Sequence, residues 1–115
     1  MKLGERQKRL FIIDPKDVES AVADHNYVTL TAHGETYLAR ISLRRLEARL
    51  EGTAFIRIHK SLMNNLDHVR YIERRPRGAL AFTLRSGALF HSSPIYRARI
   101  LSCTSAGVSE SLDNP

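Results

Sequence analysis

The sequence lacks three features that would each define a class of protein: a cysteine framework, a long apolar run and a glycine-rich phosphate loop. Because Cys103 is the only cysteine, no internal disulfide and no cage of thiolate metal ligands can form. No apolar run approaches the about 20 residues that a membrane-spanning helix needs. Leu10–Ile13 is too short for the apolar core of a signal peptide. We therefore expect a cytoplasmic protein without membrane association.

Motifs for metal or catalytic chemistry are also missing. The 5 histidines show neither HxH nor HxxxH spacing, and no carboxylate lies at a motif distance from them. His91 precedes Ser92 and Ser93, but the glycines of a nucleophile elbow are absent. No glycine-rich loop follows an expected strand. The sequence predicts that the protein is not an enzyme and has no metal or cofactor.

The charge is unbalanced toward cations. The 115 residues include 18 Lys and Arg against 12 Asp and Glu, which gives a formal net charge of +6. This length suits one domain with its own core. A basic excess favours a polyanionic partner such as nucleic acid, although a solvated basic surface without a partner is the alternative.

Short alternating segments separated by turn residues predict a mostly-β domain of about seven to ten strands. Two pairs of segments flank the turn signals His33-Gly34 and Ser86-Gly87, so we expect two hairpins. Their strands are 27–31 with 36–41, and 79–84 with 88–92.

One segment has helical periodicity instead. Leu43, Leu46 and Leu50 form one apolar stripe, with Ser42 placed as N-cap and Gly52 as the stop. A further helical turn is expected within residues 96–101. We divide the chain into a basic lead-in (1–9), a globular domain (10–103) and a flexible tail (104–115).

Basic residues cluster in the ranges 40–49, 70–77 and 97–99, and polar side chains gather at strand ends, where loops can present them together. The aromatics do not form the stacking motif of an RNA-binding sheet, because Phe55 and Phe82 fall on core positions of strands. Double-stranded DNA is therefore the favoured partner.

The order of these pieces resembles the LytTR-type DNA-binding domain, the output domain of many bacterial response regulators. The most specific match is an aromatic residue followed by R-x-H-x-S-x-x-x-N. Here these positions are Phe55, Arg57, His59, Ser61 and Asn65. The supporting matches are Asp17-Val18, Asn26-Tyr27-Val28, the Ser42–Leu50 helix, Ile72, Ser86-Gly87, and Ser93 with Tyr96. The resemblance covers about Leu10 to Leu101.

The resemblance implies a LytTR-like stack of small antiparallel sheets, with about ten short strands and one short helix. It also implies a bacterial transcriptional regulator whose loops enter successive major grooves of bent DNA. Two copies would occupy paired direct repeats, under the control of a sensor or receiver partner.

In the family, three loop positions contact base edges. Two of them correspond here to Asn26 and Lys60, while the third falls on Pro94, which has no side-chain donor. Either Ser92, Ser93 or Arg97 takes over the third contact, or one groove is read less specifically.

The remaining candidate residues have supporting roles. Lys60 could donate to guanine or contact a phosphate, and Asn26 could read adenine or be a left-handed turn residue. We expect His59 to order its loop and Asn65 to be structural. The residues expected to contact the DNA backbone or to support it are Tyr27, His59, Ser61, Ser92, Ser93 and Arg97.

A protein-interaction module is the rival hypothesis. On that view the chain keeps the LytTR-like fold but has only non-specific affinity for DNA or RNA. The proline at position 94 favours this alternative, because it removes one of the three expected contacts with base edges.

Overall fold

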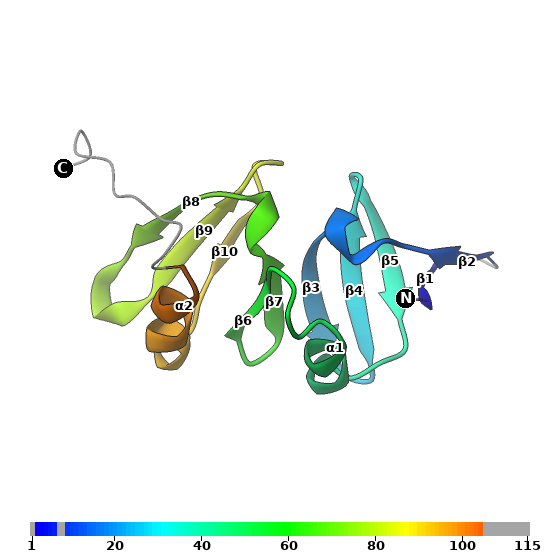
Figure 1. Ribbon diagram of the computed structural model, residues 1–115, viewed down its shortest axis with the longest axis horizontal. Helices are drawn as coiled ribbons and strands as arrows, with labels where there is room; N and C mark the ends of the chain where they lie inside the picture. The colour runs from blue at the N-terminus through cyan, green and yellow to red at the C-terminus, as the bar shows by residue number, and fades with distance from the viewer. Residues whose placement is uncertain (1, 7–8, 105–115) are drawn as a thin grey trace.

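The computed structural model describes residues 2–6 and 9–104 (Figure 1). The strands are β1 (Lys2–Arg6), β2 (Arg9–Ile12), β3 (Val18–Asp24), β4 (Tyr27–Ala32), β5 (Glu35–Ala39), β6 (Phe55–His59), β7 (Leu62–Asn65), β8 (Val69–Arg74), β9 (Leu80–Leu84) and β10 (Leu89–His91). The α-helices are α1 (Leu43–Arg49) and α2 (Arg97–Thr104). Short 3-10 turns are η1 (Pro15–Asp17), η2 (Leu66–His68), η3 (Pro76–Gly78) and η4 (Pro94–Tyr96).

The strands form two antiparallel sheets, which confirms the mostly-β prediction. The larger sheet has the order β2-β1-β5-β4-β3-β7-β6, and the smaller has the order β10-β9-β8. Part of the expected lead-in belongs to the larger sheet, because β1 pairs with both β2 and β5. Of the expected tail, Thr104 ends α2, and residues 105–115 lie outside the described part of the chain.

Both hairpins predicted from turn signals are present. In the β4–β5 turn, His33 and Gly34 have φ angles of 53° and 75°. Positive φ at both central residues gives the turn a twist that matches the flanking strands. In the β9–β10 turn, Gly87 has a φ of 96°, a conformation that side chains rarely adopt.

The predicted helix is α1, and its N-cap is the predicted one. The Ser42 hydroxyl accepts a hydrogen bond of 3.1 Å from the Arg45 amide. Leu43, Leu46 and Leu50 are buried. The helical turn expected near residues 96–101 is longer than predicted, since α2 runs from Arg97 to Thr104. The described chain therefore has two α-helices rather than one.

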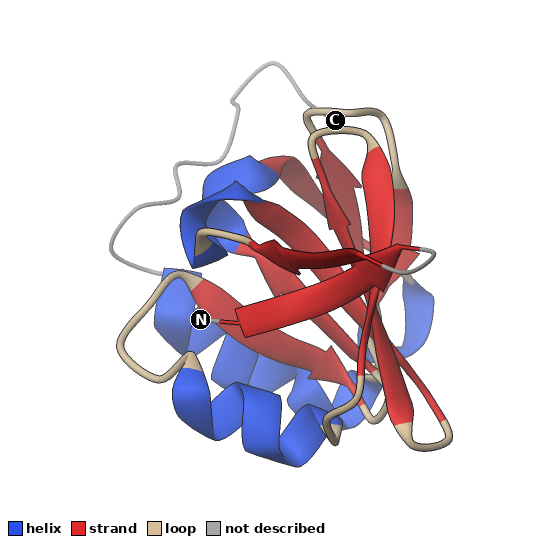
Figure 2. Cartoon of the chain, turned by 90° about the vertical axis from the view of Figure 1, so that its right-hand side faces the viewer, coloured by secondary structure: helices blue, strands red, loops and turns tan. Residues whose placement is uncertain are grey.

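Two apolar clusters lie on either side of the β6–β7 hairpin. One packs α1 against the larger sheet and includes Leu46 and Phe55. The other packs α2 against the smaller sheet and includes Ile58 and Phe82. Because successive residues of a strand face opposite sides, β6 contributes to both clusters. Figure 2, which looks along the long axis, shows most helical segments on one side of the strands.

The Asn65 side chain joins β7 to β3. Its amide nitrogen donates to the Val18 carbonyl at 2.9 Å, and its carbonyl oxygen accepts from the Asp67 amide at 3.0 Å. The side chain thus caps η2 and satisfies a carbonyl that is 47 residues away in sequence. The Asn65 side chain is 2% exposed and its bond to Val18 is buried, so water cannot replace it at the Val18 carbonyl.

We expect Asn65→Ala to lower the free energy of unfolding by about 1–3 kcal/mol, because it leaves the buried Val18 carbonyl unpaired and removes the cap of the Asp67 amide. Urea denaturation measures this change. The matched control is Asn26→Ala, at an exposed turn residue, for which we expect a change within about 0.5 kcal/mol. Equal effects of the two substitutions would contradict a structural role for Asn65.

Candidate nucleic-acid interface

Three connections lie side by side at one edge of the molecule. They are the β3–β4 turn (residues 25–26), the β6–β7 turn (60–61) and the loop from β10 into η4 (92–96). The Ala23 amide donates to the Ser61 carbonyl at 2.8 Å, and the Ser93 amide donates to the Ile58 carbonyl at 2.9 Å. Backbone bonds therefore tie the second connection to β3 and the third connection to β6. We call this the basic edge, and it lies at the bottom of Figure 1.

Charge is distributed unevenly between the two edges. The basic edge and its flanks carry Arg40, Lys60, Arg75, Arg77 and Arg97, with Asp24 and Glu73 as acidic neighbours. The opposite edge carries the β4–β5 and β9–β10 turns, η1 and η2, and lies at the top of Figure 1. Its acidic residues are Asp14, Asp17, Glu35 and Asp67, with Lys16 and Arg85 as basic neighbours. A polyanion is therefore attracted to the edge that carries the three connections.

The two candidate base readers are both exposed at the basic edge. The side chains of Asn26 and Lys60 make no hydrogen bond or ion pair with any described residue, so their donors are free for a ligand. The alternative that Asn26 is the left-handed turn residue is wrong. His25, at the preceding position, has the positive φ of 55°. The turn therefore does not require an asparagine at position 26 for a left-handed backbone conformation.

The Arg57 guanidinium holds the turn that carries Lys60. Its Nε donates to the His59 carbonyl at 2.9 Å, and Nη2 donates to the Lys60 carbonyl. Its Nη1 makes an ion pair of 3.0 Å with Glu47 of α1. The Arg57 side chain is only 15% exposed, so its contacts with His59 and Glu47 are partly shielded from water, while the bond to Lys60 lies at the surface. One planar group thus fixes both the shape of the turn and its position against α1.

His59 makes local bonds within the same turn. Its Nδ1 accepts from the Ser61 amide at 3.2 Å and lies 3.2 Å from the Ser61 hydroxyl. These contacts bend the chain directly after β6, where the sheet register also shifts between Arg57 and His59. The Lys60 side chain is thereby presented to solvent at the tip of an ordered turn.

Glu47 also connects the two halves of the molecule. Its second carboxylate oxygen pairs with Arg99 of α2 at 3.0 Å, so α1, β6 and α2 share one carboxylate. Arg99 is 63% exposed, and water screens this pair more than the pair with Arg57. The Arg57 contact is therefore the stronger of the two.

The third connection differs from the expectation based on its serines. Ser92 is 5% exposed, and its hydroxyl accepts from the Leu80 amide at 3.0 Å. This hydroxyl is used inside the protein and is not presented at the surface. Ser93 is half-buried and bonds to Ile58 through its backbone amide, while Arg97 is half-buried at the start of α2.

Tyr27 supports the first connection. The Arg40 guanidinium lies 5.5 Å from the centroid of the Tyr27 ring, within the range of a cation–π contact. Arg40 follows β5, whose residue Ala39 pairs with Val28, so the contact joins two neighbouring strand ends. It places an arginine beside the β3–β4 turn.

Sequence reasoning missed the network of Arg57, Glu47 and Arg99. One signal for it exists: Arg57 occupies a position between Ile56 and Ile58 on a strand, and so shares a face with buried Phe55. A charged residue on a core-facing side needs a partner. Which carboxylate supplies that partner depends on how α1 packs on β6, and this packing is not encoded locally.

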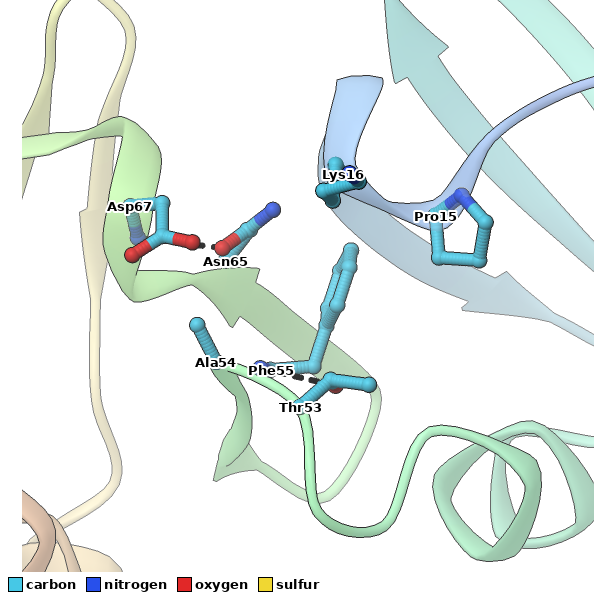
Figure 3. Close-up of a pocket in the computed structure, with 7 residues that line it drawn as sticks. All are labelled: Pro15, Lys16, Thr53, Ala54, Phe55, Asn65 and Asp67. Atoms are coloured by element: carbon cyan, nitrogen blue, oxygen red, sulfur yellow. Dashed lines mark hydrogen bonds between the residues drawn. The ribbon is translucent and has the colours of Figure 1, made fainter.

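A small pocket lies at the other end of β6 and β7, away from the Lys60 turn (Figure 3). Its lining includes Lys16, Thr53, Phe55, Asn65 and Asp67. Its cavity volume is about 40 Å³, far below the roughly 300–1,000 Å³ of typical small-molecule sites. Among residues 2–6 and 9–104, no three His, Cys, Asp or Glu side chains form a group that could hold a metal ion. The described helices are also too short and too polar to cross a membrane.

The fold and the basic edge define a mostly-β domain in which turns between strands present exposed polar and cationic side chains together. The sequence model of the LytTr DNA-binding domain family matches residues 8–102. The chain belongs to this family, which is a kind of DNA-binding domain and not a kind of enzyme.

Known relatives agree with this assignment. The chain is 35% identical over 63 residues to the heme-containing CO-sensing transcriptional regulator RcoM 2 of Paraburkholderia xenovorans (strain LB400), covering 55% of this chain and 24% of that protein. It is 25% identical over 89 residues to the sensory transduction protein LytR of Staphylococcus haemolyticus (strain JCSC1435), covering 77% of this chain and 35% of that protein.

A solved LytTr DNA-binding domain from Bacillus cereus superimposes with a TM-score of 0.83. The two chains are 19% identical, and the match covers 92% of this chain and 95% of the other. This similarity establishes the fold. The chain thus spans about a quarter to a third of the curated relatives but nearly all of the solved domain.

We expect Arg57→Lys to loosen the β6–β7 turn, because lysine keeps the charge but lacks the planar fork that serves three acceptors. The free energy of unfolding should fall by about 1–3 kcal/mol. Backbone NMR order parameters of Lys60 and Ser61 should fall below the roughly 0.85 of rigid backbone. The control is Arg44→Lys on the exposed face of α1. Unchanged order in the turn would contradict the role given to Arg57.

Proposed function

We propose that the chain binds double-stranded DNA in a sequence-specific manner, with its turns in successive major grooves, and acts as a bacterial transcriptional regulator at paired direct repeats. The observation that carries this proposal is the position of Asn26 and Lys60. Both side chains are exposed, without a partner among the described residues, and held at neighbouring connections of the basic edge. Because the chain belongs to a family of DNA-binding domains, we take DNA as the polyanion that binds this edge.

Affinity would come mainly from phosphate contacts. Arg97 and the Ser61 hydroxyl flank the candidate readers and suit contacts that fix the register of the protein on the duplex. Tyr27 would contribute indirectly, because it positions Arg40 beside the first turn. Bending the DNA so that all three connections reach it would cost on the order of 1–6 kcal/mol, offset by the additional contacts.

Specificity would come from two donor groups, the ammonium group of Lys60 and the side-chain amide of Asn26. Lys60 can donate to O6 and N7 of guanine, and Asn26 can pair with N6 and N7 of adenine. The turn around Lys60 is already ordered by Arg57 and His59, so little conformational freedom is lost on binding. Asn65 takes no part in this recognition and stays a structural residue.

Regulation would come from outside this domain. The curated relatives are longer proteins, one named as a CO-sensing transcriptional regulator and one as a sensory transduction protein. By analogy, we propose that a sensor or receiver partner controls this domain in the bacterial cytoplasm. Two copies would then occupy the paired repeats.

The rival function is a protein-interaction module with only non-specific affinity for nucleic acid. Selection of bound duplexes from a random pool separates the two. Our proposal expects enriched sequences that contain spaced direct repeats. A pool without enrichment would support the rival.

We expect Lys60→Ala to weaken binding to the selected duplex by about 1–3 kcal/mol and to relax the preference at one base pair. A gel-shift competition with excess unselected duplex measures both effects. Arg44→Ala, which removes an exposed cation from α1, is the matched control and should leave the preference intact. If Lys60→Ala also left the base preference intact, the proposal that this lysine contacts a base edge would be wrong.

Salt provides an independent test of the phosphate contribution. If about five phosphates are neutralised, the logarithm of the binding constant should fall with the logarithm of salt concentration at a slope of about −4 to −5. Fluorescence anisotropy with labelled duplex measures this slope. Binding that barely changes with salt would exclude phosphate neutralisation as the main source of affinity.

A further inference from the structure

The loop from β10 into η4 carries an isoleucine that is almost fully exposed. Ile95 is 84% exposed and directly follows Pro94, the position at which a third polar reader is missing. The burial of an apolar side chain is favourable, and no described residue covers Ile95, so its side chain is available for a contact with a ligand.

The backbone around Ile95 is fixed. The Ser93 amide donates to the Ile58 carbonyl at 2.9 Å, and the Tyr96 amide donates to the Ser93 carbonyl at 3.0 Å. Pro94 restricts its own φ angle and begins the 3-10 turn. The side chain of Ile95 is therefore held at a defined place, next to the β6–β7 turn that carries Lys60.

Two arginines belong to the elements next to this loop. Arg97 follows two residues later, at the start of α2. The η3 turn packs against the same loop, since a Cβ placed on Gly78 would lie 3.7 Å from both Pro94 and Arg97. This turn presents Arg77, which is exposed, has a φ of 64° and makes no ion pair with a described residue. A ligand suited to this surface would therefore be anionic overall and apolar at one point.

A protein partner fits this surface less well. Ile95 is flanked by Pro94, Arg97 and Arg77 and belongs to neither apolar cluster of the fold. A single apolar side chain offers much less area than the contiguous patches that mark protein-binding sites. In the major groove, by contrast, the C5 methyl group of thymine is an isolated apolar group among polar base edges and phosphates.

We propose that Ile95 contacts the C5 methyl group of a thymine in the groove that the β10–η4 loop enters. In this chain, apolar readout of thymine then replaces the hydrogen-bonding reader that Pro94 cannot provide. Arg97 and Arg77 contact the phosphates on either side. This inference rests on the proposed function, and it predicts a thymine at a fixed distance from the base pair that Lys60 reads.

Replacement of thymine by deoxyuridine tests the contact, because it removes only the methyl group. Each thymine of the selected duplex is replaced in turn, and the dissociation constants are measured by anisotropy. We expect the wild-type chain to bind about two- to fourfold more weakly when one particular thymine is replaced. For Ile95→Ala, the same replacement should have no effect.

The matched control is Ile12→Ala on β2, where the isoleucine is 86% exposed and lies at the far edge strand of the larger sheet. This variant should keep the full effect of the deoxyuridine replacement. Thermal unfolding checks that both variants remain folded, as expected for exposed positions.

Two results would overturn the inference: no thymine whose methyl group matters, or a methyl effect that persists in Ile95→Ala. Either result leaves the proposed function standing, because the chain would still prefer the selected duplex. A chain that shows no preference among duplexes would overturn the proposed function and this inference together.

Discussion

The Arg57 guanidinium is the contact on which the geometry of the basic edge depends. It donates to the carbonyls of His59 and Lys60 and pairs with Glu47. A largely buried guanidinium without these partners would cost several kcal/mol, so the turn, α1 and β6 stabilise one another. Because β6 also lies between the two apolar clusters, the turn that carries Lys60 is fixed relative to both halves of the molecule.

This construction separates stability from recognition. The clusters, the Asn65 amide and the Ser92 hydroxyl use buried groups and keep the strands in register. Two side chains that face solvent at the basic edge, Asn26 and Lys60, have no hydrogen-bond or ion-pair partner among the described residues. Turns on a rigid sheet can therefore change the residues that contact DNA without loss of the fold, and our proposal for Pro94 and Ile95 is such a change.

Local features of the sequence predicted the local structure. The turn residues His33-Gly34 and the N-cap Ser42 each have a short-range physical cause, and both predictions are confirmed. The network of Arg57 and Glu47 was not predicted, because it depends on contacts between elements. The left-handed residue was placed at Asn26 as one alternative, whereas His25 adopts that conformation. Likewise, the burial of Ser92 follows from its bond to Leu80, which depends on sheet pairing.

The central claim is that DNA binds the edge formed by residues 25–26, 60–61 and 92–97. An NMR titration of the chain with its selected duplex tests this claim most directly. The account predicts that backbone amide shifts change mainly at these residues. The opposite edge, with the turns at 33–34 and 86–87, should change little. Shift changes concentrated at that opposite edge would contradict the account.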